Sequence, residues 1–182
     1  MYVGGREAKV RGVTSSASGI AASNAGTITG CGVHGTVSSS GSPAGGIAYI
    51  NTGTINGCYS EAKVTSSSSQ AGGIATSNEG TITGCGVHGT VSSSVSSAGG
   101  IACWNYRTIN GCYSVAKVTG SVSQAGAIAY HNDTGYITNC FWYRHPQGNA
   151  QRGIFSGRAG EATEYISETE TINAWNLWKQ GN

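Results

Sequence analysis

The sequence predicts an all-β chain folded as a right-handed parallel β-solenoid (β-helix) of about five 27-residue coils with a C-terminal helical cap. Two observations lead to this prediction. The same residue types recur at one fixed step along the chain, and each repeat holds only short runs of apolar, β-branched residues separated by glycine and serine. Fixed periods of about 20–50 residues mark stacked repeat architectures. Runs this short and this glycine-rich are typical of strands rather than helices.

Five aligned positions define the repeat, and each forms a column of equivalent residues. The columns are Val10, Val37, Val64, Val91 and Val118; Ile20, Ile47, Ile74, Ile101 and Ile128; Asn24, Asn51, Asn78, Asn105 and Asn132; Ile28, Ile55, Ile82, Ile109 and Ile137; and Cys31, Cys58, Cys85, Cys112 and Cys140. The last two columns shift by one residue at their final member, because the segment from Asp133 to Gly135 carries an inserted residue.

One coil cannot bury its own apolar side chains, so neighbouring coils have to stack. Stacking places equivalent residues about 4.8 Å apart, and the valine, cysteine and two isoleucine columns are then expected to point inward. Gly72 and Gly73, with their counterparts, are expected to form tight corners that a Cβ would obstruct. Each buried Val or Ile contributes about 1.5–3 kcal/mol, so the core does not need disulfides.

The cysteine and asparagine columns are interpreted as structural. An odd number of evenly stacked cysteines at an inward position favours free, buried thiols over disulfides, and Cys103 stands outside the column. Stacked cysteines lie in a line, whereas zinc needs converging ligands, so no metal site is expected. The asparagine amides are expected to bond to one another along the stack. Asn132 begins a glycosylation sequon, but its place in this column favours the structural role.

Alternate coils differ, so a second period of twice the coil length overlies the first. The segments from Gly30 and Gly84 read Gly-Cys-Gly-Val-His-Gly-Thr-Val, and those from Gly57 and Gly111 read Gly-Cys-Tyr-Ser-x-Ala-Lys-Val. Two columns are expected to be exposed: Lys9, Thr36, Lys63, Thr90 and Lys117; and Glu7, His34, Glu61, His88 and Val115. The alternation keeps like charges from facing each other on neighbouring strands. On a flat face the His and Glu side chains do not converge, which disfavours a metal site.

Composition narrows the classes of partner and the cellular location. Only 10% of the residues are charged, the formal net charge is +2, and the ten Lys and Arg form no run, so neither nucleic acid nor membrane insertion is expected. No signal peptide follows Met1, because the chain begins in the middle of a repeat. We therefore expect a piece of a longer exported chain with further domains, located outside the cell or on its surface.

Several segments resemble the GLUG motif of bacterial surface proteins. The segment Gly72-Gly73-Ile74-Ala75, followed by Asn78-Glu79-Gly80-Thr81-Ile82-Thr83-Gly84-Cys85, is similar to the motif itself. Asn56-Gly57-Cys58-Tyr59-Ser60 and Asn110-Gly111-Cys112-Tyr113-Ser114 resemble its N-x-C-Y-S part. The resemblance as a whole covers about residues 5–142. Asn139-Cys140-Phe141-Trp142 and Asn173-Ala174-Trp175-Asn176 resemble the end of such arrays. The usual G-Y after G-G-I-A is missing. The resemblance implies a tandem repeat of an adhesin, or of the non-catalytic region of an IgA-specific metallopeptidase, without catalytic residues.

The chain is expected to divide into a solenoid of GLUG-like repeats over 1–142 and a capping segment over 143–182. Ser167 and Glu170 form a plausible capping box for a helix over about 168–179, with Ile172, Trp175 and Trp178 as candidate packing residues. Because open solenoid ends invite aggregation, the segment is interpreted as a cap. Docking of a next domain is the alternative.

No catalytic residues and no cofactor are predicted. Asp133 is the only aspartate, and the glutamates within the repeats are Glu7, Glu61 and Glu79. Glycoside-cleaving sites need clustered carboxylates, and no serine lies in a nucleophile-elbow context. The sequence therefore predicts a protein that is not an enzyme.

Three functions fit such a rod. The first is a structural or adhesive module that binds a host or surface glycan or protein through aromatic and arginine side chains: Tyr49, Tyr59, Trp104, Tyr106, Arg107, Tyr113 and Tyr130. The alternative to this site is that these residues are scattered surface aromatics. The second function is ice binding by an outward array of Thr27, Thr29, Thr54, Asn56, Thr81, Thr83, Thr108 and Asn110. The third is an extracellular filament subunit that self-associates end to end.

Overall fold

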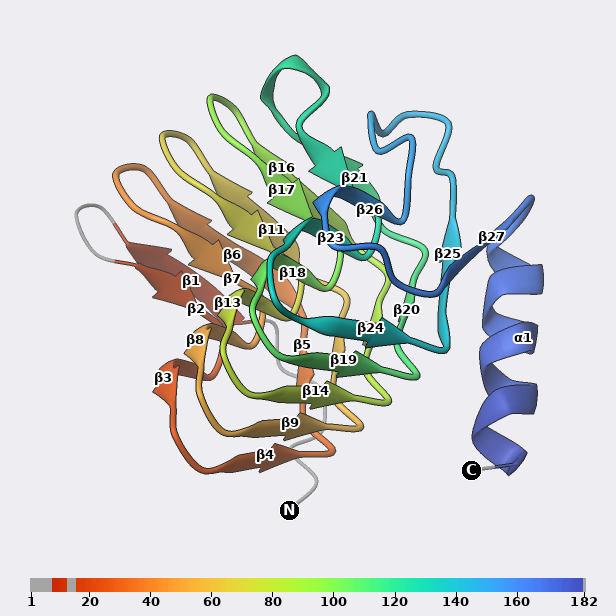
Figure 1. The fold of residues 1–182 in the computed structure, drawn as a ribbon. Helices are drawn as coiled ribbons and strands as arrows, with labels where there is room; N and C mark the ends of the chain where they lie inside the picture. The colour runs from red at the N-terminus through yellow and green to blue at the C-terminus, as the bar shows by residue number, and fades with distance from the viewer. Residues whose placement is uncertain (1–7, 13–15, 182) are drawn as a thin grey trace.

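A computed structural model describes residues 8–12 and 16–181. The chain is a parallel β-solenoid of about five coils followed by one α-helix, as the repeat predicted. Each coil contributes a strand to each of five parallel sheets, and Figure 1 shows these coils stacked on one another. Each sheet takes its name from a residue type that recurs in it.

Two sheets form the elongated arm of each coil. The Val sheet contains β1 (Ala8–Gly12), β6 (Gly35–Ser39), β11 (Lys63–Ser66), β16 (Thr90–Ser93) and β21 (Lys117–Thr119). The Ala sheet contains β2 (Ala17–Ser18), β7 (Ala44–Gly45), β12 (Ala71–Gly72), β17 (Ala98–Gly99) and β22 (Ala125–Gly126). The serine-rich loops join these two sheets, and one of them contains a short 3₁₀ helix, η1 (Ser121–Ser123).

Three further sheets complete the coil. The Asn sheet contains β3 (Ala21–Asn24), β8 (Ala48–Asn51), β13 (Ala75–Asn78), β18 (Ala102–Asn105), β23 (Ala129–Asn132) and β26 (Ile154–Gly157). The Ile sheet contains β4 (Thr27–Thr29), β9 (Thr54–Asn56), β14 (Thr81–Thr83), β19 (Thr108–Asn110) and β24 (Tyr136–Thr138). The Tyr sheet contains β5 (Gly32–Val33), β10 (Tyr59–Ser60), β15 (Gly86–Val87), β20 (Tyr113–Ser114), β25 (Cys140–Tyr143) and β27 (Ala162–Tyr165).

The strand register confirms the predicted stacking of equivalent residues. Val64 lies opposite Val37 and Val91 on the neighbouring strands, a step of one repeat on each side. The step lengthens by one residue only beyond Asn132, where Ile137 pairs with Ile109. The inserted residue therefore bulges out of one loop and leaves the sheets intact.

The inward columns form the core. Ile47, Ile74, Ile101 and Ile128 are completely buried, and so are Ile55, Ile82 and Ile109. Ile20, the first member of its column, is 43% exposed because it belongs to the first coil. The core is thus a stack of like side chains, each covered by its equivalent in the next coil.

Left-handed backbone turns the chain from the Ile sheet into the Tyr sheet. Gly30, Gly57, Gly84 and Gly111 have φ between 58° and 61° at this corner, a region in which glycine carries no Cβ penalty. In the fifth coil Asn139 takes the position with φ 50°, as asparagine tolerates this conformation better than most residues. At the predicted Gly72–Gly73 corner the constraint is steric, because a Cβ on Gly73 would lie 1.9 Å from the Gly100 carbonyl oxygen.

The asparagine column is a hydrogen-bonded ladder, as predicted. The Nδ2 atom of each asparagine donates to Oδ1 of the next over 2.7–2.8 Å, from Asn24 through to Asn132. Each amide also donates to a backbone carbonyl, for example Asn51 to Thr81 at 3.2 Å. Asn132 ends the ladder with its amide bonded to the Arg158 carbonyl. Its side chain is therefore engaged in the structure of the solenoid.

All six cysteines are free thiols, as the column suggested. Cys58, Cys85, Cys112 and Cys140 are buried, and Cys31 in the first coil is partly exposed. Burial raises the pKa of the Cys112 thiol well above its usual range, and raises that of Cys103 to about 12. Because the thiolate is the reactive form, burial protects the Cys112 and Cys103 thiols from oxidation.

We therefore expect most of the column cysteines to be found unpaired. Mass spectrometry of the denatured protein, alkylated without reductant, should recover them as modified free thiols. Recovery of a bridge between neighbouring coils, such as Cys58–Cys85, would contradict this expectation.

Strand pairing continues beyond residue 142, into the segment expected to act as the cap. β26 pairs with β23, where Ile154 lies opposite Ala129, and β27 pairs with β25, where Ala162 lies opposite Cys140. The loop between β25 and β26 covers the end of the arm, where the Asn149 side chain bonds to both backbone groups of Gly120. Residues 154–165 thus add part of a sixth coil.

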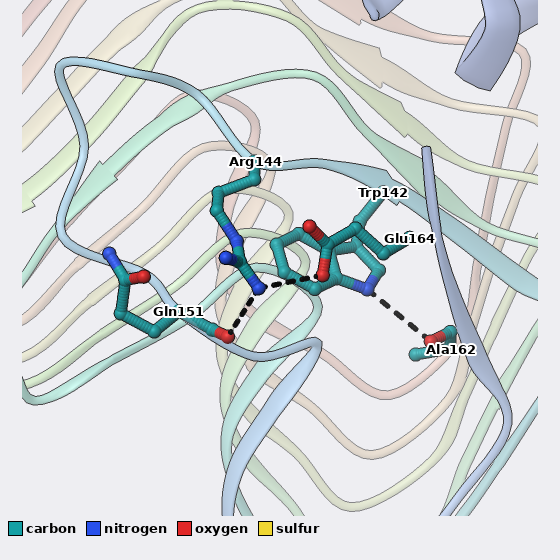
Figure 2. Close-up of polar contacts among 5 residues, drawn as sticks. All are labelled: Trp142, Arg144, Gln151, Ala162 and Glu164. Atoms are coloured by element: carbon teal, nitrogen blue, oxygen red, sulfur yellow. Dashed lines mark hydrogen bonds and ion pairs between the residues drawn. The ribbon is translucent and has the colours of Figure 1, made fainter. Parts of the chain in front are cut away.

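Trp142 closes the last coil. It lies opposite Ser114 on the neighbouring strand, is 3% exposed, and donates from its indole Nε1 to the Ala162 carbonyl at 3.3 Å. Arg144 lies 5.9 Å from the indole centroid and forms a 2.9 Å ion pair with Glu164, as Figure 2 shows. The Trp142 indole and the ion pair therefore join the fifth coil to the partial sixth coil.

The helix α1 (Glu168–Gly181) begins with the predicted capping box and lies beside the stack. Ser167 Oγ accepts from the Glu170 N–H at 3.2 Å and donates to the Glu170 carboxylate at 3.1 Å. The helix packs against β20, β25 and β27, on the outer face of the Tyr sheet, rather than across the open end (Figure 1). The Trp175 indole donates to the Gly111 carbonyl at 2.9 Å and fixes this position.

Candidate functional site

The seven predicted ligand-binding residues fall into separate groups. Trp104, Tyr106 and Tyr130 come together on the outer side of the Asn sheet, with the exposed Arg107 directly after Tyr106. Tyr59 and Tyr113 lie on the Tyr sheet, and Tyr49 lies alone on β8, three coils before Tyr130 in its column. The residues are therefore not one site, and the first group is the densest.

This group continues into a surface that we call the aromatic ridge, formed by Trp104, Tyr106, Tyr130, His131 and Phe155. The Trp104 and Tyr106 rings are nearly parallel, at 8° with centroids 6.3 Å apart. Trp104 meets Tyr130 edge-on at 5.8 Å and His131 at 4.9 Å. Tyr130 stacks on Phe155 at 5.4 Å and 17°. Such ring contacts hold the side chains in fixed orientations, so the ridge is a preformed surface.

Two members of the ridge are not among the predicted residues, for different reasons. His131 lies one repeat beyond Trp104, and the register places the two opposite each other. The regular step of the repeat therefore contained the signal for His131. Phe155 reaches Tyr130 only because β26 follows β23 at a shorter step, with Ile154 opposite Ala129. No repeat in the sequence marks that step.

Polar groups at the ridge are few. His131 Nδ1 lies 2.9 Å from Ser156 Oγ. Partial burial, with Asp133 and Glu79 adding to it, raises the pKa of the Tyr106 phenol. The ridge therefore offers mainly ring faces and hydroxyl groups to a ligand.

The outer face of the Tyr sheet carries two equivalent units, each built from a glycine, a histidine and a tyrosine. Tyr59 lies opposite Gly32 and Gly86, and Tyr113 lies opposite Gly86. Tyr59 lies over Gly32, and Tyr113 lies over Gly86. A Cβ on either glycine would be only 2.2–2.3 Å from the tyrosine ring, so each ring occupies the space that a side chain would need. This contact matches the alternation of glycine and tyrosine over the first four coils, and the alternation ends in the fifth coil, where Phe141 lies opposite Tyr113.

Each tyrosine also bonds to a histidine. Tyr59 Oη lies 3.2 Å from His34 Nε2, and Tyr113 Oη bonds to His88 Nε2. Burial, with the Glu61 carboxylate adding to it, raises the pKa of the Tyr113 phenol to about 12. Both phenols therefore take part in a hydrogen bond to an imidazole, and Tyr113 is the more deeply buried.

The column of Glu7, His34, Glu61, His88 and Val115 was predicted to be exposed. The prediction holds for His34, Glu61 and His88, which are at least partly exposed, and is wrong for Val115. His34 Nδ1 and Glu61 Oε2 form a 3.0 Å ion pair with both side chains partly exposed. Val115 is only 2% exposed, because it lies in the coils whose outer face α1 covers. A buried position favours an apolar residue, and Val115 stands here at the position that Glu61 occupies in the second coil. Glu7 lies outside the described residues.

We expect Gly86→Ala to destabilise the fold by about 1–3 kcal/mol, because the new methyl group would push the Tyr113 ring off the sheet. Gly26→Ala is the matched control, since a Cβ there would meet no atom within 4 Å. A double-mutant cycle with Tyr113→Ala should give a coupling energy close to the cost of Gly86→Ala. Additive effects would contradict the packing of Tyr113 on Gly86.

The threonine array predicted as the ice-binding face is regular. Thr81 pairs with Thr54 and Thr108, and Thr83 pairs with Asn56 and Asn110, all on the outer side of the Ile sheet. Thr27 and Thr29 continue the two columns at the first coil. At the last coil Tyr136 replaces the threonine, with Arg158 stacked on its ring at 4.3 Å.

Residues 8–12 and 16–181 hold no cluster typical of a metal centre. In that part of the chain no three His, Cys, Asp or Glu side chains are placed to hold a metal ion. None of its helices combines the length and the apolar surface that a bilayer crossing requires.

The fold and the ridge define a parallel β-solenoid repeat protein with a preformed aromatic surface. The chain is similar to a Bacteroides ovatus protein of known crystal structure that is provisionally assigned as an immunoglobulin A1 protease, with a TM-score of 0.66 and 23% identity. The match covers 94% of this chain but only 59% of the Bacteroides chain. No family model matches the sequence, the GLUG repeat included, and no curated protein matches it.

Proposed function

We propose that this chain is a non-catalytic, structural and adhesive module of a longer bacterial protein, which is secreted or held on the cell surface. Its likeness to part of a larger Bacteroides protein supports a modular role. The stack of coils is a rigid support on which neighbouring coils present side chains at fixed spacing. A binding surface on such a support needs no lid or hinge.

The aromatic ridge supports this proposal. Five aromatic or imidazole side chains on or next to β18, β23 and β26 form a chain of ring contacts, and all five keep part of their surface exposed to solvent, Phe155 most of all at 37%. Aromatic side chains are enriched where proteins bind ligands, because they bury a large area at little cost in conformational entropy. A glycan of the host or of another surface is the ligand that we propose, since sugar rings present apolar faces that stack on aromatic rings.

A glycan array tests the ridge. Trp104→Ala should weaken binding at least tenfold, as expected for a central aromatic residue worth about 2 kcal/mol or more. Tyr49→Ala is the control, because Tyr49 lies in the same sheet but outside the ridge. Glycan binding that survives Trp104→Ala would exclude the ridge. If the ridge bound a protein ligand but no glycan, the proposed site would stand and the proposed ligand would be a protein instead of a glycan.

Ice binding is a second candidate, because the threonine columns of the Ile sheet are in strict register over four coils. A thermal-hysteresis assay tests it, with Thr81→Tyr as the variant that interrupts the flat array. Activity that Thr81→Tyr abolishes would support ice binding, and absence of thermal hysteresis in the unchanged protein would exclude it.

A further inference from the structure

A hollow of about 400 Å³ lies on a different face from the ridge, between the Tyr sheet and the C-terminal half of α1. We call it the helix cleft. Its side-chain walls are Tyr59, Glu61, His88, Tyr113, Trp175 and Lys179. Pockets for small ligands have volumes of about 300–1,000 Å³, so the helix cleft has room for a sugar ring or a small oligosaccharide.

The cleft exists because α1 covers the glycine corner of one coil but leaves the equivalent corners of the two preceding coils open. The corner at Gly111 is covered by Trp178, whose ring lies about 2 Å from where a Cβ would be. The equivalent corners at Gly84 and Gly57 line the floor of the cleft, and a Cβ on Gly57 would meet no atom within 4 Å. The floor is therefore bare backbone, open to a ligand.

The aromatic wall is held in place before a ligand arrives. The Tyr113 and Trp175 rings lie 4.5 Å apart at 43°, and the Trp175 indole is fixed by its hydrogen bond to the Gly111 carbonyl. On its other side Tyr113 is held by His88. Rings already fixed in their bound orientation lose little entropy on binding.

The polar groups of the cleft carry both signs of charge. Lys179 Nζ lies 4.8 Å from the centroid of the Trp175 ring, on the helix side. Glu61 lies on the sheet side of the cleft and is exposed. Its carboxylate also forms the ion pair with His34, which is outside the cleft lining. One carboxylate and one ammonium group give the cleft no net charge that would favour a charged ligand. They suit a ligand whose hydroxyl groups both donate and accept hydrogen bonds.

From these observations we propose that the helix cleft binds an uncharged sugar. Its ring would pack against Trp175 and the exposed Tyr59 ring, with the buried Tyr113 holding Trp175 from behind, and its hydroxyl groups would bond to Glu61, His88 and Lys179. The site goes beyond the proposed adhesive function and does not require the aromatic ridge to bind anything.

NMR titration of the whole chain tests this proposal through the indole N–H resonance of Trp175. The probes are the neutral sugars cellobiose, lactose, maltose and N,N′-diacetylchitobiose, with galacturonic acid and glucosamine as charged counterparts. We expect at least one neutral sugar to shift the Trp175 resonance with a Kd in the millimolar range or tighter, about −4 kcal/mol, and the charged sugars to bind more weakly.

Variants separate this site from the ridge. Glu61→Gln and Lys179→Ala should each raise the Kd at least about tenfold, as expected for the loss of a hydrogen bond to a charged group. Glu79→Gln and Lys117→Ala change charge in the same way outside the cleft and should leave the Kd unchanged, as should Trp104→Ala. Thermal melts of all variants establish that they fold. No shift of Trp175 with any neutral sugar, equal binding of the charged sugars, or binding unaffected by Glu61→Gln and Lys179→Ala would each overturn the proposal.

Discussion

Ile74→Asp is expected to unfold the stack of coils. Ile74 is completely buried in the third coil, between Ile47 and Ile101 of the same column. An aspartate there would place a carboxylate among aliphatic side chains with no partner for its charge. Burying an unpaired charge, with loss of the isoleucine, should cost about 5 kcal/mol or more. That equals the whole stability of many domains.

Ile20→Asp provides the matched control for this experiment. Ile20 occupies the same column in the first coil but is 43% exposed, so its carboxylate could remain in water. Circular dichroism melts should show a cooperative transition for Ile20→Asp and none for Ile74→Asp. A melt of Ile74→Asp close to that of the unchanged protein would mean that the isoleucine column does not point inward.

The sequence predicted the solenoid because each coil obeys the same constraint. A residue that points inward in one coil must point inward in the next, so like residues recur at the coil length. The isoleucine at position 82, for example, could be assigned to the core from Ile55 and Ile109 alone. The loop insertion before Tyr136 was equally visible, because a change in step is conspicuous in a regular array.

Features outside the repeat could not be predicted in this way. The shorter step to β26, and with it the stacking of Phe155 on Tyr130, follows a segment that has no equivalent elsewhere in the chain. The position of α1 on the flank depends on the hydrogen bond between Trp175 and Gly111, two residues far apart in the sequence. Burial of Val115 depends on that position in turn. Such contacts are set by side-chain packing in three dimensions, which a one-dimensional period does not encode.

The same division applies to the candidate sites. The outward columns of threonine could be predicted completely, since they belong to the repeat. The aromatic ridge and the helix cleft arise where the repeat meets its non-repeating end: Phe155 comes from β26, and Trp175 and Lys179 come from α1. The repeat presents equivalent residues all along the stack, so a site confined to one place on it needs residues that break the repeat.

Asn78→Ala is expected to weaken the middle of the amide ladder more than any exposed substitution. The Asn78 side chain accepts from Asn51 at 2.8 Å and donates to Asn105 at 2.7 Å, and also to the Thr108 carbonyl at 3.0 Å. Removing it leaves one donor hydrogen of Asn51 and the Oδ1 of Asn105 buried without partners. Each orphaned buried group costs about 1–3 kcal/mol, so the free energy of unfolding should fall by about 2–5 kcal/mol.

Asn24→Ala, at the first rung, separates the ladder from a general effect of truncation. Asn24 is also buried, but it makes only one amide–amide bond, to Asn51. Its removal orphans the Asn51 Oδ1 and the Thr54 carbonyl but no side-chain donor, so we expect a smaller loss than for Asn78→Ala. Urea unfolding of both variants measures the difference through the transition midpoint, with the slope unchanged. Equal losses for the two variants would mean that the side-chain amides act only on their own coil, through the backbone carbonyl they bind, and that the ladder adds no stability along the stack.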